Sequence, residues 1–136
     1  MPKSGRRIDG QMTGLAGELF VAAELLKRGI QTSVTFGNAK SIDLLAYNPA
    51  NGKTFTVQVK ALRKKNYFLI DPSKIDKNHV YVFVLLNEPG TPAEYFIANG
   101  KQLAEERSRF DLHPKLPGVH PKKLEDLRDN WSVFLT

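Results

Sequence analysis

The feature that most constrains the fold is an apolar run from Val80 to Leu86. A strand that alternates polar and apolar residues can leave one face in water, whereas a continuously apolar strand has to be covered on both faces. The run is far shorter than the roughly 20 residues that cross a bilayer. It therefore predicts the central strand of a sheet that has other elements packed above and below it.

A helix before this run could supply one of those layers. Residues 13–28 have helical periodicity, with Thr13 placed to cap the start and Gly29 placed to end the helix. We expect its apolar stripe to be the buried face. The stripe consists of Leu15, Leu19, Ala22 and Leu26.

The remaining pattern predicts a sheet. Residues 31–36, 42–47 and 54–60 look like strands, and Asn51-Gly52 marks a reversal between the last two. Residues 66–70 are expected to extend the sheet, 95–98 to add a strand, and 100–109 and 122–129 to be helical. The order predicts an α/β or α+β sheet with packed helices in one domain, 1–136, with residues 1–11 as a flexible basic arm.

The composition limits the classes of partner that the chain is expected to have. The formal net charge is +6 and the sequence pI is about 9.6, which favours a polyanionic partner because phosphate contacts release counterions. There is no cysteine, so disulfide scaffolds and thiolate metal sites are excluded. No apolar run is long enough for a membrane span. We expect a cytoplasmic protein without a membrane partner.

Polar residues inside apolar elements are the candidates for chemistry. At about 100° per residue, Glu18 lies on the rim of the predicted buried face, while Glu24 points to solvent. Asp43 interrupts an apolar strand, where aspartate is rare. Each has a simpler explanation, because Glu18 could pair with a surface lysine and Asp43 could cap a backbone amide.

The third candidate is the pair Gln58 and Lys60, which alternation places on one face of a strand. A strand with a solvated face would look the same. If 42–47 and 54–60 form a hairpin about Asn51-Gly52, Asp43 lies opposite either Lys60 or Gln58. Both registers gather Asp43, Gln58 and Lys60 on one face, where we expect Glu18 to join them in a single cleft.

These four residues suit the hydrolysis of a phosphodiester bond. The reaction calls for a hard divalent cation, and Mg²⁺ prefers a few oxygen ligands together with its own waters. Asp43 would be the main ligand and Glu18 a second one, with the Val59 carbonyl and the Gln58 amide as neutral ligands. Lys60 would orient water or stabilise the pentacovalent phosphate.

These residues resemble the PD-(D/E)XK nuclease superfamily. The similarity covers Gly17 to Lys60, through GELFVAAELLKRG, SIDLLA and VQVK, and its spacing looks like that of archaeal Holliday junction resolvases. Gln58 stands where most members have an acid, and Mrr-type restriction endonucleases are similar in having Q-x-K. The resemblance implies a restriction-endonuclease-like mixed sheet with flanking helices, and an Mg²⁺-dependent (or Mn²⁺-dependent) endonuclease acting on DNA. It assigns the catalytic roles to Glu18, Asp43, Gln58 and Lys60.

Basic residues beside the site mark an expected DNA path, namely Lys40, Arg63, Lys64 and Lys65. A solvated loop is the alternative for these side chains. Alternatives for the whole chain are a catalytically silent nucleic-acid-binding or interaction module of the same fold, and an antitoxin-like or immunity-like partner. Because one small domain has to cut two strands, a homodimer is a further expectation.

Overall fold

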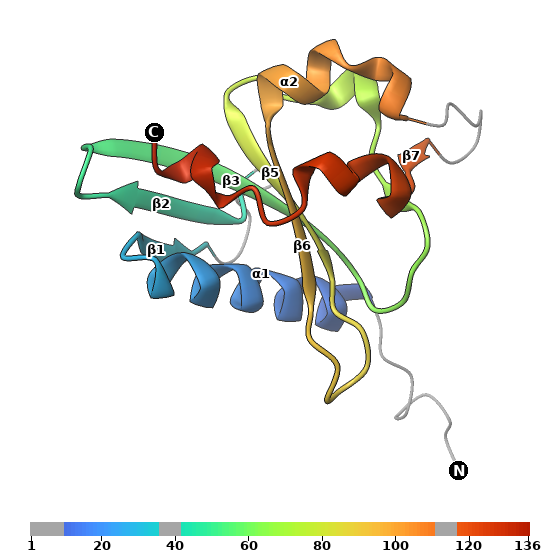
Figure 1. The fold of residues 1–136 in the computed structure, drawn as a ribbon, viewed down its shortest axis with the longest axis horizontal. Coiled ribbons are helices and arrows are strands. Elements are labelled where there is room, and N and C mark those ends of the chain that lie inside the picture. The colour runs from blue at the N-terminus through green and yellow to red at the C-terminus, as the bar shows by residue number, and fades with distance from the viewer. Residues whose placement is uncertain (1–9, 36–41, 111–116) are drawn as a thin grey trace.

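The computed structural model describes residues 10–35, 42–110 and 117–136. A mixed sheet forms its centre, with helix α1 (Gly10–Lys27) on one side and α2 (Gly100–Glu105) on the other (Figure 1). The predicted α/β class, a mixed sheet with flanking helices, is confirmed. The sheet has the order β1 (Gln31–Val34), β2 (Leu44–Asn48), β3 (Lys53–Leu62), β5 (His79–Leu85) and β6 (Glu94–Asn99).

Strand β5 is the central strand that the apolar run predicts. It pairs in parallel with β3 and antiparallel with β6, and each of its residues is buried. Val80, Val82 and Val84 face the α1 side, while Tyr81 and Phe83 face the α2 side. The sheet is therefore covered by two separate apolar clusters.

The β2–β3 hairpin has one of the two predicted registers. Leu44 lies opposite Val57 and Asn48 opposite Lys53, as in the predicted register that points Asp43 towards Gln58, but the strand pairing ends at Leu44. Gly52 has φ 75° in the turn, and its N–H donates to the Asn48 carbonyl over 2.8 Å. Glycine adopts this left-handed conformation without the steric cost of a side chain.

Three predictions about the outer elements need correction. Strand β4 (Phe68–Leu69) does not extend the main sheet but pairs with β7 (Gly118–Val119) in a separate two-stranded sheet. The second helix ends at Glu105 and is followed by the 3₁₀ turn η3 (Arg107–Arg109). Residues 122–129 lie largely in another 3₁₀ segment, η4 (Pro121–Leu127). The short 3₁₀ segment η2 (Pro72–Lys74) precedes β5.

The sequence also mispredicts the buried face of α1. Its buried residues are Gly17, Val21, Ala22 and Leu25. Leu15, Leu19 and Leu26 of the predicted stripe are instead 43%, 49% and 54% exposed. The real face lies about 100° around the helix, because α1 approaches β3 at Gly17. Gly29, with φ 80°, does end the helix, but the helix begins at Gly10, so Thr13 is not its cap.

Gly17 sets how closely α1 approaches the sheet. A Cβ added at this position would lie 2.5 Å from the Ala61 Cβ and 3.5 Å from the Val59 Cγ1. Real Cβ atoms do not approach that closely, so only glycine lets the helix backbone rest directly on β3. The next residue along the helix is Glu18, which is thereby held beside the same strand.

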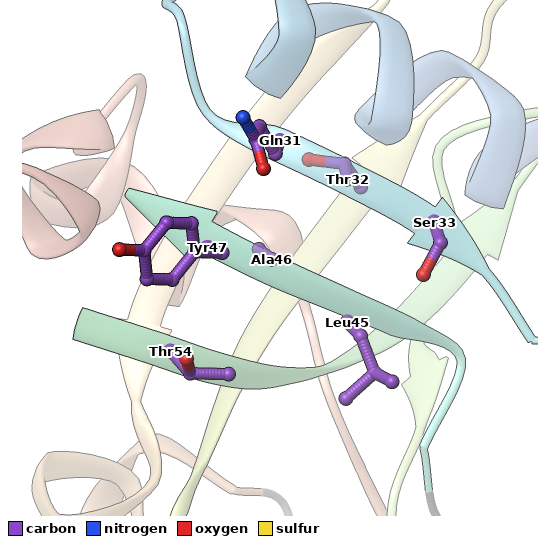
Figure 2. Close-up of a pocket in the computed structure, with 7 residues that line it drawn as sticks. All are labelled: Gln31, Thr32, Ser33, Leu45, Ala46, Tyr47 and Thr54. Carbon is purple, nitrogen blue, oxygen red and sulfur yellow. The ribbon is translucent and has the colours of Figure 1, made fainter. Parts of the chain in front are cut away.

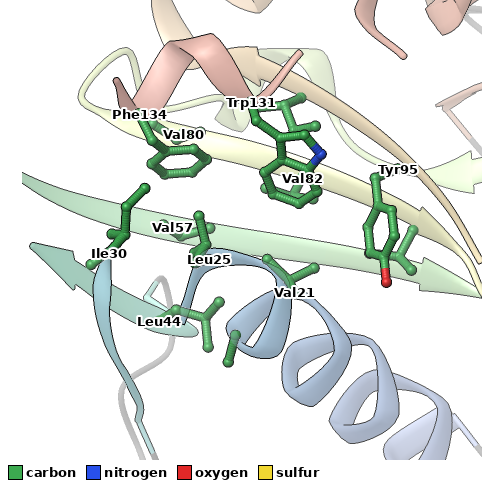
Figure 3. Close-up of a cluster of buried hydrophobic side chains, with 14 of the residues drawn as sticks. Val21, Leu25, Ile30, Leu44, Val57, Val80, Val82, Tyr95, Trp131 and Phe134 are labelled. Carbon is green, nitrogen blue, oxygen red and sulfur yellow. The ribbon is translucent and has the colours of Figure 1, made fainter. Parts of the chain in front are cut away.

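The C-terminal 3₁₀ turn η5 (Trp131–Phe134) packs into the apolar cluster that also holds the buried residues of α1 (Figure 3). The Arg28 guanidinium lies 4.4 Å from the centre of the Trp131 ring. The Asn48 side-chain amide donates to the Phe134 carbonyl over 2.9 Å, and the Lys53 ammonium donates to the Thr136 carbonyl over 2.6 Å. The end of the described chain is thus tied to the tip of the β2–β3 hairpin.

No helix in the described ranges is both long and apolar enough to cross a lipid bilayer.

The close packing of Gly17 leads to a first prediction. Gly17→Ala should lower the free energy of unfolding by about 1–3 kcal/mol, because the new methyl group overlaps Ala61. Gly14→Ala on the same helix should instead raise it by up to about 1 kcal/mol, since no atom lies within 4 Å of a Cβ there and alanine favours helix. Urea denaturation measures both variants. Adding Ala61→Gly should restore the Gly17→Ala protein, and a failure to do so would contradict the packing argument.

Candidate active site

The site is centred on the edge of β3 where β2 stops pairing with it. The last strand pair is Leu44 with Val57, and the Asp43 N–H still donates to the Val57 carbonyl over 2.9 Å. The next amide on this edge, that of Val59, donates over 2.8 Å to the Asp43 Oδ2. A carboxylate therefore takes the place of a neighbouring strand at this position.

The Val59 carbonyl points to the same edge. In a strand, the N–H and C=O of one residue point the same way, and the direction alternates from residue to residue. The Val57 carbonyl points towards β2, whereas the Leu62 carbonyl accepts from Leu86 N–H on the β5 side. Val59 has the parity of Val57, so its oxygen lies on the edge that Asp43 occupies.

Glu18 reaches this edge from α1. Its side chain is half-buried, and burial followed by the charge of Asp43 raises the pKa of Glu18 to about 6. Two carboxylates are thus brought together from a helix and a strand end that are far apart in sequence. The charge of Asp43 disfavours ionisation of Glu18, as a like charge does at short range.

Glu18 occupies this position for a different reason from the one the sequence suggests. The predicted stripe is exposed, and Glu18 follows Gly17 on the face that packs against β3. The expectation that Glu24 points into solvent is wrong: it is half-buried, and its Oε1 accepts from the Arg28 guanidinium over 2.8 Å.

Gln58 and Lys60 do not share a face with α1. Gly17 faces Val59 and Ala61, so alternation puts Gln58 and Lys60 on the opposite side of β3. There they line a hollow of about 360 Å³ together with Tyr81. The expectation of one cleft on one face therefore needs correction: Gln58 and Lys60 lie on the far face of β3 from the helix that carries Glu18, while Asp43 lies at the strand edge, where it accepts from the Val59 N–H.

The donor set at the edge fits a hard cation. Two carboxylates with a backbone carbonyl beside them are the oxygen ligands that Mg²⁺ prefers, and a cation would offset both the burial and the nearby Asp43 charge that raise the pKa of Glu18. Among the described residues there is no group of three or more His, Cys, Asp or Glu side chains that could hold a metal. The set at the edge would instead complete two carboxylates with neutral oxygens and water.

The basic residues expected along a DNA path are only partly described. Lys40 lies outside the described residues. Arg63 is half-buried, and its Nε donates to the Thr13 Oγ1 over 3.1 Å, while Lys64 and Lys65 are exposed. The sequence interpretation missed Asp71 and Lys74, which line the hollow beside Lys60. No local pattern marks them, because only the fold brings η2 next to β3.

A second hollow lies on the outer face of β1, β2 and β3 (Figure 2). It has a volume of about 320 Å³, and Figure 2 shows Leu45, Tyr47 and Thr54 at its surface. None of its lining residues is charged, so it offers neither a metal ligand nor a cation for phosphate.

Comparison with known proteins gives similarity at the level of structure. No protein-family profile and no curated protein sequence matches the chain. The structure of a bacterial homing endonuclease, I-Ssp6803I, is similar with a TM-score of 0.67 and 14% identity, covering 95% of this chain and 93% of that chain. Archaeoglobus fulgidus Hjc, a Holliday junction resolvase from an archaeal hyperthermophile, is similar with a TM-score of 0.58 and 13% identity, covering 90% and 96%.

The chain has the PD-(D/E)XK nuclease fold. The resemblance that the motifs suggest is therefore confirmed for the fold. At this level of identity, the roles of individual residues rest on the geometry of the site.

The raised pKa of Glu18 leads to a second prediction. Because the folded-state pKa lies above the usual 4.5, ionised Glu18 destabilises the fold: the penalty is absent below pH 4.5 and complete once the pH has passed 6. Glu18→Gln should therefore raise the unfolding free energy above pH 6, by about 1 kcal/mol after allowance for solvent screening. Thermal unfolding between pH 4 and 8, in the absence of divalent metal, measures this.

The exposed Glu88 provides the control. Glu88→Gln should show no such dependence on pH. Added Mg²⁺ should raise the melting temperature of the wild type more than that of Glu18→Gln. Equal pH profiles for Glu18→Gln and wild type would contradict the raised pKa of Glu18.

Proposed function

We propose that the chain is an Mg²⁺-dependent endonuclease that hydrolyses phosphodiester bonds in DNA, with Mn²⁺ as a substitute metal. The observation that carries this proposal is the meeting of the Glu18 and Asp43 carboxylates at the edge where the Val59 carbonyl also points. The similar structures are those of a homing endonuclease and a Holliday junction resolvase, which supports DNA as the substrate.

Each side chain then has a distinct task. Asp43 and Glu18 would bind the metal, with the Val59 carbonyl and the Gln58 amide oxygen as neutral ligands. When bound, Mg²⁺ supplies an activated water and offsets the negative charge that grows on the phosphate. The Lys60 ammonium would orient the attacking water or stabilise the pentacovalent phosphate. The hydrogen bond from Val59 N–H to Asp43 holds that carboxylate in place before metal arrives.

Gln58 favours one competing function. An amide in place of an acid removes a negative charge from the metal site, which weakens the attraction for a cation. A catalytically silent nucleic-acid-binding or interaction module would tolerate that loss. Glu18, Asp43 and Lys60 are all present, however, and a module without catalysis has no need to half-bury Glu18 near the charge of Asp43.

Two further aspects of the proposal concern how DNA is held. Arg63, Lys64, Lys65 and Lys40 are proposed to contact the DNA backbone. A second copy of the chain is proposed to bind the first, because the exposed Leu15, Leu19 and Leu26 form an uncovered apolar helix face. Cutting of both strands in one encounter, read from the products of a cleavage assay, would support the dimer, whereas single nicks would contradict it.

The third prediction tests catalysis through three variants. Asp43→Asn should eliminate metal-dependent cleavage while leaving the fold intact, because an amide oxygen can still accept from Val59 N–H but cannot supply the charge. Lys60→Ala should abolish turnover and leave Mg²⁺ affinity equal or slightly higher, since a nearby positive charge is removed. Gln58→Glu should tighten Mg²⁺ binding and preserve or raise activity.

Calorimetric titration with Mg²⁺ and a cleavage assay on duplex, branched and single-stranded DNA provide the two readouts. A wild type that cuts nothing with Mg²⁺ or Mn²⁺, together with a Gln58→Glu variant that gains neither metal binding nor activity, would establish the silent module instead.

The fourth prediction concerns the basic residues after β3. Replacing Arg63, Lys64 and Lys65 together by alanine should flatten the dependence of DNA affinity on salt by about one unit of log–log slope for each phosphate that is no longer neutralised. Fluorescence anisotropy across a series of salt concentrations measures the slope. An unchanged slope would place the nucleic-acid surface elsewhere.

A further inference from the structure

The hollow on the far face of β3 from α1 brings Gln58 and Lys60 of the proposed site together with residues to which neither the resemblance nor the metal site assigns a role. Gln58 and Lys60 line it from β3, and Asp71 and Lys74 line it from the segment around η2. Its volume of about 360 Å³ lies within the range of small-molecule and group-binding sites. It lies directly beside the proposed catalytic lysine.

The charges around this hollow are mostly positive. Lys60 and Lys74 approach it from two different elements, and Arg107 is close enough to Asp71 to lower the pKa of that carboxyl. Within the described ranges, neither lysine has a carboxylate oxygen at ion-pair distance. Two ammonium groups without an ion-pair partner, facing one hollow, are suited to an anion.

Asp71 is the acid within this group, and its role is local. Its Oδ1 accepts from the Ser73 N–H over 3.0 Å and from the Ser73 hydroxyl over 2.7 Å, so it caps η2. The hydrogen bonds from Ser73, and then the charges of Lys74 and Arg107, hold the pKa of Asp71 below its usual range. Asp71 therefore stays ionised, fixes the segment that carries Lys74, and adds one negative charge to the wall of the hollow.

The apolar residues of the hollow favour a phosphate that belongs to a nucleic-acid strand over a free inorganic ion. Leu69, Ile70 and Ile75 line the hollow, and Leu69 is 58% exposed at its rim. An apolar rim next to paired cations suits a phosphate that carries a sugar and base. The Gln58 amide can hydrogen-bond such a group from β3.

We propose that this hollow binds a non-reacting phosphodiester group of the nucleic-acid backbone, next to the one that is cut, between Lys60 and Lys74. The inference rests on the proposed nuclease function and adds a place where the strand is held. Lys60 would serve both the reacting phosphate and its neighbour. The strand would then cross β3 at the Val59 edge, with Lys74 anchoring the side away from α1.

Binding measurements without catalysis test this. Fluorescein-labelled duplex DNA is titrated with the full chain in EDTA at several salt concentrations, and anisotropy gives affinity and salt slope. Lys74→Gln should weaken binding by up to about tenfold at low salt and reduce the slope by about one unit. Lys77→Gln is the matched control, because Lys77 is exposed three residues further on and does not line the hollow.

Asp71→Asn provides a change of opposite sign. Asparagine retains the oxygen that caps η2, so the segment keeps its position, while the loss of the negative charge should tighten DNA binding. In a cleavage assay, Lys74→Gln should raise KM and leave kcat nearly unchanged, because Lys74 contacts a phosphate that does not react.

The outcomes separate the two proposals. If the wild type binds and cuts DNA but Lys74→Gln behaves like Lys77→Gln, the hollow does not hold the strand and the nuclease proposal stands. If Asp71→Asn weakens binding as much as Lys74→Gln does, the hollow is not an anion site. If the wild type neither binds nor cuts any DNA, both proposals are overturned.

Discussion

Strand β3 is paired further along one of its edges than along the other, and the rest of the structure depends on that difference in length. It pairs with β5 from Thr56 to Leu62 but with β2 only as far as Val57. The backbone groups of Val59 are therefore offered to side chains instead of to another strand. Buried backbone donors are almost always satisfied, so a polar acceptor is needed at this point, and Asp43 provides it. Asp43 thus satisfies a backbone amide and also supplies a carboxylate to the proposed metal site.

Much of this arrangement could be predicted from the sequence, because it follows from short-range patterns. The apolar run at Val80 predicts the central strand, Asn51-Gly52 predicts the hairpin, and Gly29 predicts the end of α1. The hairpin register, with Leu44 opposite Val57, is one of the two that strand alternation allows. Each of these features depends on residues that are close together in the chain.

The predictions that failed depend on contacts between distant segments. Leu15 and Leu19 fall at helical spacing, so the helix pattern favours them as the buried face, but the close approach of Gly17 to Ala61 decides the packing. The same contact determines that α1 covers the Val59 face, which separates Glu18 from Lys60 by the thickness of one strand. Lys74 could not be found at all, because its place beside Lys60 exists only once the sheet has formed.

The tie between the chain's last residues and the hairpin has a kinetic consequence. The turn of the hairpin is local and can close early, whereas the bond from Asn48 to the Phe134 carbonyl joins residues 86 positions apart. Contacts of such separation form slowly, since loop-closure entropy has to be overcome before they contribute. Until η5 arrives, Phe55 lacks the edge-to-face partner that it has in Phe134, at 5.1 Å between ring centres. The hairpin that carries half of the site would thus form early, while its contacts with η5 would form late.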